Sequence, residues 1–162
     1  MAHIEGSVRI KAPVEEAFRY VSDWQHVGEF YEGIQMYRPV GEVECGDGAK
    51  FECSRRVPIL GELEYVMEMS DFVENHGWTF RSVEGIPLEE HWWFEDLSRW
   101  PRETRLNYDL KYKVPVPVVG GLVDRLFVKR KWEECLGHCL QNIKVRLEQR
   151  EGNRPAIAEA TG

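Results

Sequence analysis

The feature that most constrains the fold is a long stretch near the C-terminus with the composition and periodicity of one amphipathic helix. From Gly121 to about Gln149 the chain contains no proline and is rich in good helix formers. At about 100° per residue its apolar side chains gather on one side and charged or amide side chains lie opposite. The apolar side comprises Val128, Trp132, Leu136, Cys139, Leu140, Ile143 and Leu147. At ~1.5 Å per residue this helix is about 40 Å long, so it requires an equally long apolar surface.

The chain before this helix reads mainly as β-strands. Apolar and polar residues alternate from Ile34 to Lys113, which is typical of strands with one buried face, and His3–Ala12 shows the same pattern. Turns rich in glycine and proline divide the longer stretch into six strands. These strands are predicted at Ile34–Cys45, Lys50–Val57, Glu62–Met69, Trp78–Ser82, Leu88–Asp96 and Thr104–Lys113. Short connections favour an antiparallel meander, and native twist will curl it.

Two short helices are predicted between the first two strands, at Pro13–Asp23 and Trp24–Glu32. The sequence therefore predicts an α+β fold, in which a seven-stranded curved antiparallel sheet wraps around the long C-terminal helix. Val114–Gly121 is read as a linker because prolines interrupt it. We expect residues 1–150 to form a single domain and residues 151–162 to be a disordered tail.

The composition limits the classes of partner. The net charge is −7, which argues against nucleic-acid binding, because phosphate contacts require a basic surface. No apolar run approaches the ~18 residues of a membrane span, so no stable membrane insertion is predicted. The N-terminus lacks the pattern of a signal peptide, and we expect a cytoplasmic location.

The four cysteines are not predicted to form disulfides, since no export signal is recognised. Cys135, His138 and Cys139 could be three metal ligands, but no second pair stands at zinc-site spacing. We favour small buried thiols on the apolar side of the helix. The sequence therefore predicts no metal site.

This order of elements, with specific residues at the joints, resembles the superfamily of START domains, Bet v 1 allergens and bacterial polyketide cyclase/dehydrase and lipid-transport-like proteins, called SRPBCC. The resemblance covers about residues 3 to 149. Its matching stretches are Ile10–Phe18, Val21–Asp23, Phe30–Ile34, Thr104–Tyr108, and Tyr112 through Gly120-Gly121-Leu122 into the long helix. It implies the helix-grip fold with high specificity. It implies no single function, because lipid carriers, hormone receptors and cyclases share the fold.

The resemblance also implies an elongated apolar cavity between sheet and C-terminal helix, and the sequence supplies residues suited to line one. Aromatic rings and methionines with a few polar tips are typical of sites that orient an apolar ligand. The candidate ligand-binding residues are Phe51, Tyr65, Met67, Met69, Phe80, Trp92, Tyr108 and Tyr112 from the sheet, with Lys129, Trp132, Leu136 and Leu140 from the helix. The alternative is that these side chains fill a closed core.

Signals for catalysis are weak. The chain has no Gly-x-Ser-x-Gly, no His-Glu-x-x-His and no glycine-rich phosphate loop. Candidate acid/base groups are Tyr65, His91, Tyr108, Tyr112 and Glu133. Adjacent strand residues point to opposite faces, so His91 lies outside if Trp92 points inward.

Lys129 and Glu133 lie beside the apolar side of the helix, four residues apart. They form either an ion pair on a solvated flank or polar contacts at the mouth of a cavity.

Three functions remain open at the level of sequence. The first is a cofactor-free protein that binds or transports a hydrophobic small molecule, such as a lipid, a sterol-like compound or a polyketide. The second is a cofactor-independent cyclase, aromatase or dehydratase that uses the same cavity. The third is a non-catalytic partner protein with a vestigial cavity. A monomer or a homodimer is expected in each case.

Overall fold

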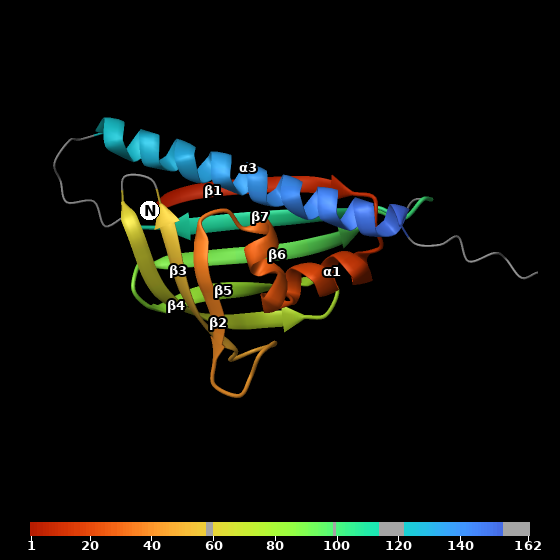
Figure 1. The fold of residues 1–162 in the computed structure, drawn as a ribbon, viewed down its shortest axis with the longest axis horizontal. Helices are drawn as coiled ribbons and strands as arrows, with labels where there is room; N and C mark the ends of the chain where they lie inside the picture. The colour runs from red at the N-terminus through yellow and green to blue at the C-terminus, as the bar shows by residue number, and fades with distance from the viewer. Residues whose placement is uncertain (58–59, 99, 114–121, 154–162) are drawn as a thin grey trace, which may run out of the picture.

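The computed structural model describes residues 1–57, 60–98, 100–113 and 122–153. The predicted linker and most of the predicted tail lie outside these residues. In the described part, the sheet is covered on one side by helices (Figure 1). The elements in chain order are β1 Ala2–Ile10, α1 Val14–Ser22, the 3-10 turn η1 Trp24–His26, α2 Val27–Phe30, β2 Ile34–Val40, β3 Lys50–Val57, β4 Gly61–Val73, β5 Gly77–Glu84, β6 Leu88–Asp96, β7 Thr104–Tyr112 and α3 Leu122–Gly152.

The sheet has seven strands in the order β1-β7-β6-β5-β4-β3-β2, and every neighbouring pair is antiparallel. The predicted seven-stranded antiparallel sheet is confirmed. Strands β2 to β7 form the meander, and β1 completes the sheet by pairing with β7, for example Ile4 with Leu110. A pairing between strands so far apart in sequence places the edge strand β1 where α3 can cover it (Figure 1).

The long helix packs as its pattern predicts. All seven residues of the predicted apolar side are buried. The helix approaches β1 closely at Gly6, where an added Cβ would lie 3.0 Å from Leu140 Cδ1. Because glycine has no side chain, α3 can lie close to β1 at this position.

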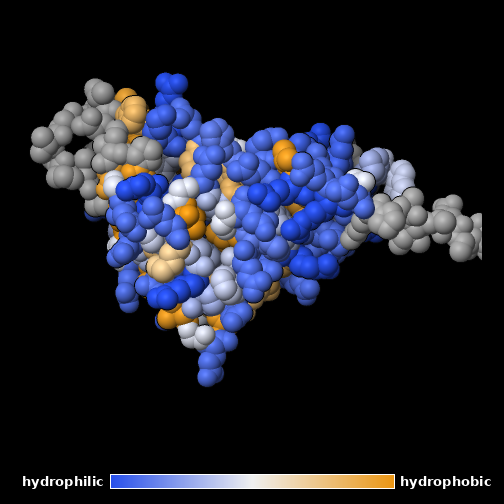
Figure 2. Space-filling model, viewed as in Figure 1, coloured by the Kyte–Doolittle hydropathy of each residue, from blue (hydrophilic) through white to orange (hydrophobic). Residues whose placement is uncertain are grey.

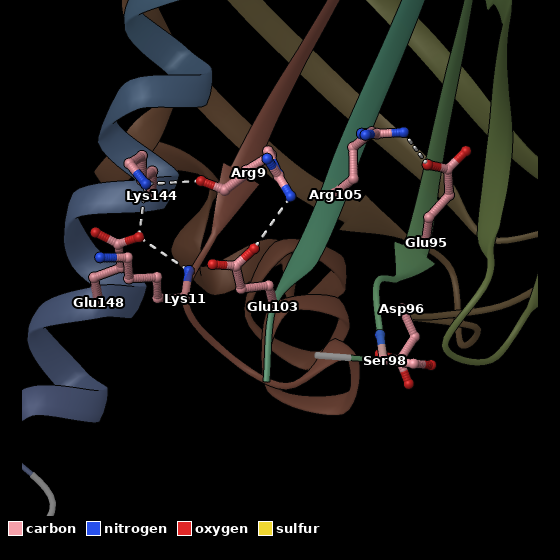
Figure 3. Close-up of polar contacts among 9 residues, drawn as sticks. All are labelled: Arg9, Lys11, Glu95, Asp96, Ser98, Glu103, Arg105, Lys144 and Glu148. Atoms are coloured by element: carbon pink, nitrogen blue, oxygen red, sulfur yellow. Dashed lines mark hydrogen bonds and ion pairs between the residues drawn. The ribbon is translucent and has the colours of Figure 1, made fainter. Parts of the chain in front are cut away.

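Polar contacts fix the C-terminal half of α3 to the end of β1 (Figure 3). The Lys144 ammonium donates to the carbonyl oxygen of Arg9 at 2.7 Å, and the amide of Lys11 donates to the Glu148 carboxylate at 2.9 Å. Lys144 and Glu148 also bond each other at 2.7 Å. The first two contacts satisfy backbone groups near the end of β1, which is an edge strand and has a neighbouring strand on one side only.

Burial alternates along the strands, so one face meets the core and the other meets water. The outer face carries cross-strand ion pairs such as Arg105 with Glu95 at 3.1 Å (Figure 3). Figure 2 shows one side of the molecule as mostly hydrophilic, with separate apolar patches. No helix among the described residues combines the length and apolarity needed to cross a bilayer.

The element boundaries differ most from the sequence predictions at three places. The stretch predicted as one helix at Trp24–Glu32 is the turn η1 followed by the single-turn α2. Strand β2 ends at Val40 because pairing with β3 stops at the Val40–Lys50 pair. Strand β4 extends to Val73 because an irregularity between Ser70 and Val73 lets pairing with β5 continue.

Candidate functional site

The core-facing side of the sheet carries a carboxyl group. In β6 the inward positions are Leu88, Glu90, Trp92 and Phe94, and each is buried. Glu90 is only 3% exposed. A carboxyl group in this position is costly unless it is hydrogen-bonded or stays neutral.

Hydrogen bonds from neighbouring aromatic residues surround Glu90. The hydroxyl of Tyr31 donates to Oε1 at 3.3 Å, and the indole N–H of Trp92 donates to Oε2 at 3.4 Å. The Tyr31 hydroxyl also lies 3.0 Å from the hydroxyl of Tyr108. Burial raises the pKa of Glu90, although Arg55 and these donors act in the opposite direction. The cluster can therefore hold or release a proton inside an apolar interior.

A buried cation lies near this carboxyl. Arg55 follows Phe51 and Cys53 at the inward positions of β3 and is 4% exposed. Its guanidinium carbon lies 4.7 Å from the ring centre of Tyr31 and 4.5 Å from that of Trp132. The terminal Nη2 donates to the thiol of Cys135 at 2.7 Å. Two aromatic faces thus hold the cation between the sheet and α3.

Next to the Glu90 cluster lies an internal cavity of about 30 Å³. That volume holds about one water molecule. Its lining comes from α1, η1, α2 and the inner faces of β2 to β6: Val21, Ser22, Trp24, Val27, Phe30, Tyr31, Ile34, Tyr37, Phe51, Tyr65, Met67, Met69, Trp78, Phe80, Glu90 and Trp92. Six predicted ligand-binding residues are among them, namely Phe51, Tyr65, Met67, Met69, Phe80 and Trp92.

The other predicted ligand-binding residues lie elsewhere. Tyr108 is buried beside Tyr31, and Tyr112 stacks on Trp132 with ring centres 4.7 Å apart. Leu136 and Leu140 pack against β1 at Gly6. No residue in the described part of α3 lines this cavity, because the helix lies directly on β1 and the short helices cover the remainder of the concave face.

Three predicted polar candidates lie on the surface. His91 is exposed on the outer face of β6, stacked on Trp93 with ring centres 4.8 Å apart, while Trp92 points inward. Lys129 and Glu133 are 43% and 49% exposed and form an i,i+4 ion pair at 3.6 Å. This is the geometry of the solvated flank, since neither side chain reaches the described cavity.

A groove of about 240 Å³ runs on the other side of Arg55, between the β3 end of the sheet and α3. Arg55, Trp132 and Cys135 belong to its lining, together with Glu32, Gly33, Arg56, Val57, Lys131, Glu134 and His138. Tyr31, which covers one side of Arg55, lines the internal cavity instead. Arg55 therefore lies in the wall that separates the cavity from the groove.

Sequence reasoning missed Glu90, Arg55 and Tyr31. The signal for the first two was present, because a period of two continues from Phe51 and Cys53 to Arg55 and places Glu90 on the face of Trp92. Charged residues at inward positions are unusual and indicate a buried polar site. Tyr31 could not be found in this way, since it follows a one-turn helix whose orientation depends on tertiary packing.

Metal-ligand geometry occurs at one place in the described residues, on the outer face. His3, Glu5 and Asp109 place one ligand atom each within 4.8 Å of one another. His3 already bonds Asp109, and the Lys111 ammonium lies 4.0 Å from the same carboxylate. Of the two thiols predicted to be buried on the helix, Cys139 is fully buried, whereas Cys135 is only half-buried and contacts Arg55. His138 contacts Glu32 at 3.0 Å.

Comparison with known proteins shows the family to which this chain belongs. The sequence profile of the family described as polyketide cyclase / dehydrase and lipid transport matches residues 1–148. The chain belongs to this polyketide cyclase / dehydrase and lipid transport family. No curated protein matches it by sequence.

Solved structures with low sequence identity share the fold of this family member. A protein from Thermus thermophilus is 20% identical with a TM-score of 0.77, over 92% of this chain and 99% of that one. A START superfamily protein from Mycobacterium smegmatis is 19% identical with a TM-score of 0.73, over 91% and 98%. The di-domain ARO/CYC StfQ from the steffimycin biosynthetic pathway is 15% identical with a TM-score of 0.69, over 93% and 51%. The helix-grip fold implied by the sequence resemblance is confirmed.

Proposed function

We propose that this protein binds or transports a hydrophobic small molecule, of lipid, sterol-like or polyketide-like chemistry, in the interior between its sheet and its helices. One observation carries the proposal. The internal cavity is lined by aromatic rings and methionines, and the Glu90 carboxyl belongs to the same wall with its hydrogen-bonding neighbours. A mainly apolar wall with few polar groups suits a ligand that is apolar except at one or two positions.

The size of the cavity sets a condition on binding. About 30 Å³ is far smaller than the ~300–1,000 Å³ of ligand sites, so the described state is a closed one in this proposal. Met67 and Met69 on β4 give the wall adaptable side chains, because an unbranched thioether changes rotamer easily. Ligand uptake then requires the short helices or these side chains to move away from the sheet.

Native mass spectrometry before and after organic extraction tests this proposal, followed by uptake of fluorescent fatty acids and sterols by the extracted protein. A matched pair of variants assigns the site. Met67→Trp fills the cavity and is expected to weaken uptake at least about 10-fold, whereas Val83→Trp on an exposed position of β5 leaves it unchanged. If no ligand co-purifies and none of the added fatty acids or sterols is taken up, the remaining function is that of a non-catalytic partner protein, which the small volume of the internal cavity favours.

A second candidate is a cofactor-independent cyclase, aromatase or dehydratase. Burial raises the pKa of Glu90 next to the hydroxyls of Tyr31 and Tyr108, and a carboxyl with a raised pKa suits general acid/base chemistry. Turnover of a polyketide-like substrate by Glu90→Gln and Tyr108→Phe tests it. Loss of turnover with retained binding supports catalysis; His91→Gln, on the outer face, is the control.

The cytoplasmic location and the monomeric or homodimeric state expected from the sequence remain part of the proposal. Cell fractionation and sedimentation velocity test them.

A further inference from the structure

The groove between β3 and α3 contains hydrogen-bond donors that lack acceptors. Within the described residues, Nε and Nη1 of Arg55 and the indole Nε1 of Trp132 are buried and have no hydrogen-bond partner. Both side chains line the groove. Buried donors are normally satisfied, so a group of them in one wall requires an explanation.

The charge of Arg55 has no carboxylate in direct contact, although the Glu90 carboxyl and the Tyr65 hydroxyl lie near enough to act on it. Four other charged or titratable groove residues form ion pairs with one another: Lys131 with Glu134 at 2.7 Å and His138 with Glu32 at 3.0 Å. None of the ion pairs found in the described chain involves Arg55, whose Nη2 donates instead to the neutral thiol of Cys135. Burying an arginine away from water is costly, and the two aromatic faces recover only part of this cost.

We propose that the groove is a binding site for an anionic oxygen group, a carboxylate or phosphate, at the end of the apolar ligand. Arg55 supplies the positive charge and donors, and the indole N–H of Trp132 supplies one more. The acceptors missing from the protein are thereby provided by the ligand. This inference rests on the proposed function and adds the class of ligand: an anionic amphiphile rather than a neutral apolar compound.

The position of Arg55 explains how one ligand can use both spaces. Tyr31 separates the guanidinium from the internal cavity, while Arg55 lines the groove beside Trp132 and Cys135, which contact it. The groove has about 240 Å³ for a head group, and the apolar interior receives the tail. A shift of Trp132 away from the cation exposes the donors to the head group.

Binding of three probes with the same twelve-carbon chain tests the inference by calorimetry: dodecanoate, dodecyl phosphate and dodecanol. Wild-type protein should bind at least one anion about 10-fold or more tighter than dodecanol, because hydrogen bonds between charged groups are stronger than those to a neutral hydroxyl. The better anion identifies carboxylate or phosphate as the source. Arg55→Gln should bring the anions to within about 3-fold of dodecanol while dodecanol binding persists.

Two further variants separate recognition from folding. Trp132→Phe keeps a ring over Arg55 and against Tyr112 but removes the indole N–H, so it should lower the anion preference by about 3–10-fold without unfolding the protein. Arg105→Gln removes a guanidinium from the outer face and should keep the full preference.

The outcomes are distinguishable. Equal binding of all three probes by wild-type protein overturns the anion site and leaves the proposed function intact. An anion preference that survives in both Arg55→Gln and Trp132→Phe also overturns it. Failure of all three probes to bind overturns the proposed function together with the site.

Discussion

At the scale of single residues, the unusual feature is a carboxyl and a guanidinium enclosed in the same interior without a direct ion pair between them. Tyr31 contacts both, through its hydroxyl to Glu90 and through its ring to Arg55. Burial raises the pKa of Tyr31 and of Tyr108, so both hydroxyls keep their protons and act as donors. The two tyrosines therefore contribute neutral, hydrogen-bonding hydroxyls to the cluster around Glu90.

Glu90 should make the stability of the protein depend on pH. Because burial raises its folded-state pKa above the unfolded value of about 4.3, folding favours the protonated acid. Its contribution to the free energy of unfolding is complete below that value and is lost as the pH rises through the folded-state pKa. Glu90→Gln removes this loss, so its stability relative to wild type should rise with pH, by at most about 1.4 kcal/mol per unit.

Urea unfolding of both proteins from pH 4 to 8 measures this difference. Glu89→Gln is the matched control, because Glu89 is the adjacent acid on the outer face, bonded to Arg81 at 2.8 Å. Parallel stability curves for Glu90→Gln and wild type would show that Glu90 is not held protonated.

At the scale of elements, α3 is held by its apolar side and by polar contacts to β1. Ile143 is fully buried, while Val145, two residues on, is 41% exposed. An apolar residue of α3 therefore helps to hold the helix on the sheet only if it lies on the buried side of the helix.

Ile143→Ala should lower the free energy of unfolding by about 2–5 kcal/mol, since it leaves a cavity under the helix. Val145→Ala should change it by less than about 0.5 kcal/mol, because it is exposed and alanine favours helices. Chemical denaturation of the two variants tests this. Equal losses would mean that the helix packs differently from the structure described.

The turn between β5 and β6 is a second element-scale test. Gly85 and Gly48 have nearly equal φ, 85° and 86°, but differ in surroundings. A Cβ at Gly85 would lie 2.4 Å from the Glu64 carbonyl oxygen, whereas nothing lies within 4 Å at Gly48. Gly48→Ala should cost about 1–2 kcal/mol from backbone strain alone. Gly85→Ala should cost clearly more in the same unfolding experiment; equal costs would refute the close approach.

At the scale of the whole molecule, one curved sheet and its helices surround a cavity of about 30 Å³. The long helix covers the β1 edge of the sheet (Figure 1). The proposed function requires this interior to open. Binding to the folded state alone must then appear as added global stability.

A bound amphiphile at about 100 times its dissociation constant should stabilise the protein by about 2.7 kcal/mol. For a chain of 162 residues this corresponds to a rise in Tm of roughly 5–10 °C. Scanning calorimetry with and without the ligand measures the shift, and Met67→Trp should abolish it. An unchanged Tm for wild type at saturating ligand would argue against interior binding.

The sequence by itself determined the architecture. Alternation in the strands, the glycine-containing turns and the seven-residue apolar side of α3 are local patterns, and each sets which face of an element is buried. The same alternation placed Trp92 inside and His91 outside once the face of β6 was known.

Only the tertiary structure decided the site. Six of the predicted lining residues border the cavity, but Trp132 and Tyr112 stack on each other and Leu140 packs on Gly6, because α3 lies closer to β1 than a helix pattern can show. Arg55 on β3 is enclosed by Trp132 of α3 and by Tyr31, the residue after α2, and these three residues are far apart in the chain. Periodicity gives the direction of a side chain relative to its own element, whereas the partners that meet it depend on how elements pack.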